Sequence, residues 1–283
     1  MTSQTSAVTA ADSVSLRLGD SDLATYREGT AMPPGLSPRP YLHPVRTLAG
    51  SVVTDAEPAD HLHHYGMSLA VPDVDGTSYW GGSTYVRGTG STILANHGQQ
   101  HRLAPLAAGG DMFTEQLEWR DPAGRPQLRE ERTISWSTVD DSTWALDWQS
   151  VLHAEHGPVT FGSPATNGKP GGFYGGLFWR TPFAGNDVSA VVAEGAGESV
   201  AHGSVSPWLA LTTSTRSIVL RQHGEVVPWF VRTASYVGAG PALAVDERRT
   251  VAPGIPLVLR LTVAITDRPA LSIADAATIA ARI

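Results

Sequence analysis

Histidines gather in one stretch of this 283-residue chain, and their spacing indicates where chemistry could take place. Four of the ten histidines fall between His43 and His64, inside the segment Tyr41–Gly66. Because histidine titrates near neutral pH, a positioned imidazole can move protons to and from a bound hydroxyl or carbonyl group. We therefore expect a candidate active site in this segment.

A glutamate is the natural partner for such proton transfer. Glu130 and Glu131 precede the alternating stretch Arg132–Ser137, whose pattern is typical of a half-buried strand. One of the two carboxylates must then face inward, where it would be available to a histidine. The alternative is a ladder of Arg and Glu side chains on the surface.

The same histidines also allow a metal site. If Asp60–Tyr65 is a strand, His61 and His63 lie on one face and His64 on the other. Two imidazoles on one face can hold a divalent metal when a third ligand is near. That ligand would come from a distant part of the chain. The candidates for it are His43, Glu130 and His97.

Other residues could bind a ligand. Tryptophan rings stack on the apolar faces of sugars, and Trp80 and Trp229 follow turn or loop residues where a ligand could reach them. The glycine-rich stretch Asn167–Leu177 suggests a loop near a pocket, because glycine lets a backbone approach a ligand closely. The substrate-binding candidates are Arg39, Tyr41, His61, Trp80, Lys169 and Trp229. Of these, Arg39 or Lys169 would offer positive charge to a developing oxyanion.

The elements that must position these residues are mostly strands. Short apolar segments separated by turns predict an all-β fold, a large antiparallel β-sandwich with one short C-terminal helix. The expected strands include Ser13–Leu18, Arg132–Ser137, Trp144–Trp148 and Leu257–Ile265, and the expected hairpin turns are Val74–Gly76, Asp121–Gly124 and Gln222–Glu225. The helix is predicted from Ser272 to Arg282, with a capping box at its start. Residues 1–12 are expected to be frayed, and 13–283 to form one domain.

Composition narrows the function further. The net charge of −7 and the lack of a basic stripe argue against binding to nucleic acid. The chain has no cysteine, no apolar run of transmembrane length and no secretory signal pattern, so we expect a cytoplasmic protein that does not enter membranes. No cofactor is expected other than the metal considered above. The sequence leaves open whether the chain forms a homodimer.

Three stretches together resemble a bacterial family of unknown function labelled "PmoA family": Arg39–Pro44, Asp60–Gly66 and Asp75–Trp80. The resemblance implies a supersandwich architecture like that of galactose mutarotase, and links to carbohydrate metabolism. By analogy with mutarotases, His63 or His64 would be the acid and Glu130 the base. Members carry an arginine inside the glycine-rich loop, whereas the nearest basic residues here are Lys169 and Arg180.

Our leading hypothesis is an enzyme that performs acid–base chemistry (epimerisation, elimination or hydrolysis) on a sugar or an oxidised sugar derivative. His43, His61, His63, His64 and Glu130 would carry the reaction. The first alternative is a metal-dependent enzyme that uses His61 and His63, which predicts bound metal and loss of activity with chelators. The second is a non-catalytic carbohydrate-binding protein, which predicts saturable sugar binding without a product.

Overall fold

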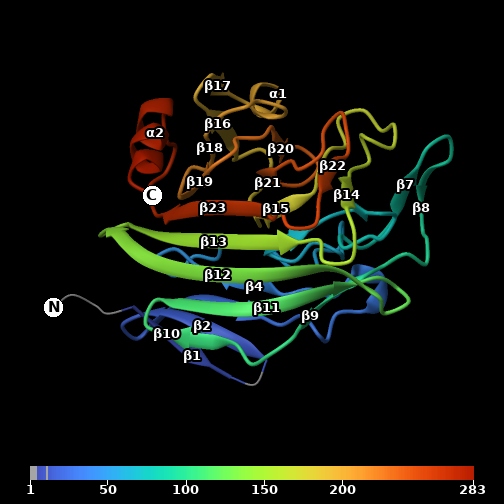
Figure 1. The fold of residues 1–283 in the computed structure, drawn as a ribbon. Coiled ribbons are helices and arrows are strands. Elements are labelled where there is room, and N and C mark those ends of the chain that lie inside the picture. The colour runs from blue at the N-terminus through green and yellow to red at the C-terminus, as the bar shows by residue number, and fades with distance from the viewer. Residues whose placement is uncertain (1–4, 11) are drawn as a thin grey trace.

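The computed structural model describes residues 5–10 and 12–283, and strands dominate it (Figure 1). The first sheet has eight strands in the order β1 (Thr5–Thr9), β2 (Ser13–Leu18), β3 (Ser21–Arg27), β4 (Tyr41–Val45), β5 (Met67–Ala70), β15 (Gly176–Arg180), β21 (Gly238–Pro241) and β20 (Trp229–Arg232). All neighbouring strands in this sheet run antiparallel.

The second sheet is larger and holds the longest strands. It contains β10 (Ala107–Gly109), β11 (Met112–Arg120), β12 (Pro126–Asp140), β13 (Thr143–His153), β23 (Leu257–Thr266), β19 (Ser217–Gln222), β18 (Trp208–Thr212), β16 (Ser189–Val192) and β17 (Gly195–Ala196), with β9 (Gln99–Arg102) beside β11. In Figure 1, β11, β12, β13 and β23 run side by side across the molecule.

Two small sheets complete the strand inventory of the described residues. They are β22 (Arg249–Val251), β14 (Val159–Gly162) and β6 (Asp73–Val74), and the hairpin of β7 (Thr84–Val86) and β8 (Gly90–Thr92). One hydrophobic cluster, extending from Val14 to Ile265, takes side chains from both large sheets. The predicted all-β sandwich is therefore confirmed.

Helix is scarce, as expected. The C-terminal helix α2 (Ile273–Ala281) begins with the predicted capping box, in which Ser272 accepts a hydrogen bond from the backbone of Asp275. Its buried side chains pack on β16, β18 and β19. The four-residue helix α1 (Glu198–Ala201) and a 3₁₀ turn at Pro34–Leu36 were not predicted. No helix in the described part of the chain is both long and apolar enough to cross a membrane.

Two expectations about local structure are wrong. Residues 5–9, expected to be frayed, form β1, which pairs with β2 along its whole length, so the sheet begins before residue 13. Residues 1–4 and 11 lie outside the described residues. The turn at Gln222–Glu225 does not close a hairpin, because β19 and β20 belong to different sheets. The turn at Asp121–Gly124 does join the paired strands β11 and β12.

Candidate functional site

Three histidines line a cavity of about 320 Å³, which we call the histidine pocket. Its walls comprise His61, His63, His64, Trp80, Ser83, Ser91, Lys169, Pro170, Gly171, Gly172, Tyr174, Phe230, Arg232 and Tyr236. A cavity of this size is at the lower end of the range that holds small ligands. The pocket is therefore large enough for a monosaccharide.

A loop, and not the predicted strand Asp60–Tyr65, carries these histidines. A backbone bridge between Ala56 and Tyr65 closes the loop, and the N–H groups of His61 and His64 donate to the carbonyls of Pro58 and His61 within it, each at 2.9 Å. These i→i+3 hydrogen bonds replace the strand ladder, so period-two alternation does not apply. All three imidazoles instead gather on one side.

The rings form a compact cluster. The centroids of His61 and His64 are 4.6 Å apart in a stacked arrangement, and those of His63 and His64 are 4.8 Å apart at nearly a right angle. His61 and His63 are 5.7 Å apart. The Nδ1 atom of His61 lies 3.0 Å from a carboxylate oxygen of Asp60, which fixes the orientation of that ring.

Arg39 stabilises the histidine loop through hydrogen bonds to its backbone and to neighbouring residues. Its guanidinium is 2% exposed and donates to the carbonyl of His63 at 2.8 Å. It also donates to the carbonyls of Leu36 and Ser37 and to the hydroxyl of Ser68. Desolvation lowers the pKa of Arg39 to about 10, so the group is still charged at neutral pH. Arg39 thus positions His63 and does not itself line the pocket.

Burial keeps two of the imidazoles neutral. Desolvation, reinforced by the charge of Arg39, lowers the pKa of His63 to about 4. Desolvation and the neighbouring histidines hold the pKa of His64 well below its usual value, and this side chain is 2% exposed. A neutral imidazole has a free lone pair that can accept a proton. The floor of the pocket therefore carries proton acceptors at neutral pH.

Aromatic rings line much of the rest of the histidine pocket. The rings of Trp80 and Tyr174 are 4.6 Å apart, and Tyr174 also contacts Phe230 edge to face. Tyr236 lies against both His61 and His64, at 4.6 and 5.1 Å between centroids. Desolvation raises the pKa of Tyr174 to about 12, so its hydroxyl keeps its proton and can donate. Apolar rings beside hydroxyl donors are the usual composition of a sugar site.

The histidine pocket shows no recognisable metal centre among the described residues. Across residues 5–10 and 12–283, no group of three or more His, Cys, Asp or Glu side chains is placed to hold a metal ion. Among the described residues, none of the three proposed third ligands, His43, Glu130 and His97, completes such a group with His61 and His63. Nε2 of His97 lies 2.8 Å from the carbonyl of Gly82.

Sequence comparison gives a family for the chain. Residues 13–281 match the pattern described as "Family of unknown function (DUF6807)". The chain belongs to this family. A solved structure titled "Crystal Structure Analysis of HI1317" aligns with 92% of this chain and 98% of its own, at 6% sequence identity and a TM-score of 0.38. No curated protein matches the chain.

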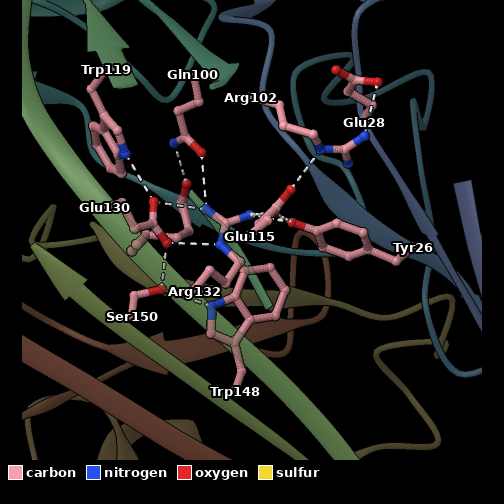
Figure 2. A network of polar contacts seen from close by, with 11 residues as sticks. Tyr26, Glu28, Gln100, Arg102, Glu115, Trp119, Glu130, Arg132, Trp148 and Ser150 are labelled. Carbon is pink, nitrogen blue, oxygen red and sulfur yellow. Dashed lines mark hydrogen bonds and ion pairs between the residues drawn. The ribbon is translucent and has the colours of Figure 1, made fainter. Parts of the chain in front are cut away.

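In this DUF6807 member, Glu130 lies outside the histidine pocket, so its expected pairing with the histidines is wrong. Glu130 does face inward from β12, while Glu131 is exposed, as the alternation predicted. The carboxylate of Glu130 accepts hydrogen bonds from Trp119 at 2.8 Å, Arg132 at 2.7 Å and Ser150 at 2.5 Å (Figure 2). The Glu130 side chain is fully buried in this network.

Three other candidates also lie elsewhere. Nδ1 of His43 lies 3.0 Å from the hydroxyl of Thr54. Tyr41 lines a separate cavity of about 240 Å³, where its ring contacts Tyr65. Trp229 is fully buried in the main core and donates to the carbonyl of Ser206 at 2.8 Å, so it cannot stack on a ligand. By contrast, His61, Trp80 and Lys169 line the pocket as expected.

Sequence reasoning missed two residues that line the pocket, Arg232 and Tyr236. They follow the histidine loop by about 170 positions and bear no motif. The loop leads into β5, and the order β5–β15–β21–β20 brings the end of β20 beside it. Only this strand order places Arg232 and Tyr236 at the pocket. The glycine-rich loop, which contributes Lys169 to Gly172, was found through its composition.

Gly82 packs directly against His63, which gives a test of ring positioning. A Cβ at Gly82 would lie 2.8 Å from Nδ1 of His63, and the φ of Gly82 is +71°. We expect Gly82→Ala to displace the His63 ring and shift its imidazole NMR signals. Gly88→Ala is the matched control, because Gly88 has a φ of +79° and open space around it. If both variants leave the signals in place, His63 does not depend on this contact.

Proposed function

We propose that this protein is a carbohydrate-related enzyme that performs acid–base chemistry on a sugar or an oxidised sugar derivative in the histidine pocket. The observation that supports it most is the pair of neutral imidazoles, His63 and His64, on the floor of a cavity with aromatic walls. Neutral imidazoles accept protons, and aromatic walls hold sugar rings. The buried network around Glu130 removes that carboxylate from the scheme and leaves the imidazoles as the bases.

His63 is the better placed of the two bases. It is only partly buried and lines the cavity, whereas His64 lies behind it almost fully covered. In the proposed step, His63 removes a proton from the carbon next to a carbonyl of the substrate. The electron pair of that C–H bond forms a C=C bond to the carbonyl carbon, and the π pair of the C=O bond moves onto the oxygen, which gives an enediolate when the first carbon carries a hydroxyl. The positive field of the buried Arg39, which donates to the carbonyl of His63, stabilises the negative oxygen.

The enediolate then has two outcomes within the same chemistry. Protonation of that carbon by water on the opposite face gives an epimer, and the imidazolium of His63 then releases its proton to solvent. Departure of a substituent from the neighbouring carbon gives an elimination product, and the proton then goes to the leaving oxygen. Both outcomes begin with the same proton abstraction, so one measurement tests them together.

Solvent exchange is that measurement. Keto-sugars and sugar acids are incubated with the protein in D₂O, and NMR follows loss of the C–H signal next to the carbonyl. We expect enzyme-dependent deuterium incorporation, unchanged by a chelator. Loss of exchange with the chelator would favour the metal-dependent alternative. Saturable binding with no exchange and no product from any sugar would contradict the proposal and favour a non-catalytic binding protein.

A further inference from the structure

The charged side chains that line the histidine pocket are cations, although the chain as a whole carries −7. Lys169 and Arg232 line it, and its described lining includes no Asp or Glu. A concave site with one sign of charge and low-dielectric walls concentrates oppositely charged ligands. The charge of the pocket lining is therefore opposite in sign to the net charge of the chain.

Lys169 is the only lysine in the sequence, since every other basic residue counted with it is an arginine. It extends from the glycine-rich loop, is exposed, and has its ammonium 5.9 Å from the ring of Tyr85. A lysine ammonium is a compact charge with three donors on a flexible stem, which suits a small anionic group. The sole lysine of the chain thus stands at the mouth of the pocket.

Two further cations lie behind the histidines. Arg39 is buried, and the acceptors that the structure gives it are three backbone carbonyls and a serine hydroxyl, all neutral. A buried charge without a counter-charge is costly to keep, so its positive field acts on the nearest polar space. Arg39 donates to the carbonyl of His63 at 2.8 Å, so its charge lies directly behind a residue that lines the pocket.

Arg180 is the second. It is 6% exposed, and its Nη2 atom donates to both carboxylate oxygens of Asp60, at 3.0 and 3.1 Å. Its Nε and Nη1 atoms, together with Nδ1 of His64, are the buried side-chain polar atoms of the described residues that have no hydrogen-bond partner. Both side chains contact the ring of Tyr236. Unsatisfied polar atoms are thus concentrated beside the pocket.

We propose that the histidine pocket binds its substrate through an anionic group, a carboxylate or a phosphate carried by the sugar. Lys169 and Arg232 contact the anion, and Arg39 and Arg180 stabilise it through their field. The counter-charges that the structure gives to these cations lie outside the pocket lining: Glu198 is 3.7 Å from Arg232, and Arg180 pairs with Asp60 at 3.0 Å and with Asp55 at 3.8 Å. This inference rests on the function proposed above, because it takes the histidine pocket as the substrate site.

Calorimetric titration of the full-length protein with D-glucuronate, D-glucose 6-phosphate and D-glucose tests the inference. We expect saturable binding of an acidic sugar at least tenfold tighter than that of glucose, and weaker at high salt. The carboxylate and phosphate arms show which anion the pocket prefers. Lys169→Met is expected to weaken the acidic ligand about three- to tenfold and to leave glucose unchanged. Arg125→Met is the control, since Arg125 is 79% exposed and outside the pocket lining.

Lys169 also offers a readout in the unmodified protein. Reductive methylation followed by mass spectrometry labels one side-chain amine, and we expect the acidic sugar to slow this labelling while glucose does not.

The inference is overturned if glucose binds as tightly as both acidic sugars, if none of the three binds, or if Lys169→Met and Arg125→Met have equal effects. These results are distinct from failure of the proposed function. That function fails when bound sugars show neither exchange nor product, whatever their charge.

Discussion

Arg132→Met is expected to lower the free energy of unfolding by about 3–5 kcal/mol, the largest effect on stability that we predict. Arg132 is 1% exposed on the inward face of β12. It donates to Glu130 at 2.7 and 2.9 Å and to the hydroxyl of Tyr26 at 2.6 Å, and lies 3.4 Å from Glu115 (Figure 2). Methionine fills similar space but leaves the buried Glu130 without its cation, whereas Glu115 keeps Arg102 at 3.0 Å.

The network around Arg132 explains why the effect is large. Glu130 and Glu115 are 0% and 4% exposed, so water cannot replace the lost partner. Coulombic attraction to these carboxylates raises the pKa of Arg132 despite the desolvation that opposes it. Removing one member of a buried charged network lowers the free energy of unfolding by more than the whole network contributes to it, because the remaining charges stay desolvated.

Urea unfolding followed by tryptophan fluorescence measures this change, with Arg129→Met as the matched control. Arg129 lies on the same strand but on the outward face, is 40% exposed, and pairs at 3.8 Å with the exposed Glu155. Its loss should cost about 0–1 kcal/mol. Equal losses in the two variants would show that the network does not contribute to stability beyond an ordinary surface pair.

The strand pattern predicted the fold well because alternation is a local property. The alternating Ser13–Leu18 became β2 with its bounds intact, and the apolar run Leu257–Ile265 became β23 between two neighbours. The inward face of Glu130 followed from the same alternation. Its chemical role did not, because the sequence does not show that Arg132 lies beside it on the same buried face.

The candidate site could be predicted only where its residues are close in sequence. The histidine cluster and the glycine-rich loop stood out by composition, and both line the pocket. The strand assigned to Asp60–Tyr65 was wrong because a backbone bridge between Ala56 and Tyr65 closes this segment into a loop, which local periodicity cannot reveal. Arg232 and Tyr236 reach the site through strand order, a long-range property. Trp229, similar in type to Trp80, points into the core instead.

His63→Gln is expected to reduce kcat by about 10²- to 10⁴-fold, the largest effect on activity that we predict. Glutamine retains polarity and similar size but cannot take up a proton. His153→Gln is the control, since His153 lies on β13, outside the pocket lining. Initial rates on the sugar identified by solvent exchange measure the change. Retention of more than a tenth of the activity in a folded variant would exclude His63 as the base.

The pH profile of the wild-type protein tests the same residue without a substitution. The base acts in its neutral form, and the pKa of His63 is lowered to about 4, so kcat/KM should stay level from pH 7 to about 5 and fall near pH 4. A histidine with its ordinary pKa would lose activity near pH 6.5. An anionic substrate adds a further effect, because its charge favours the imidazolium. The fall in kcat, which reports the bound state, should therefore occur at a higher pH than the fall in kcat/KM.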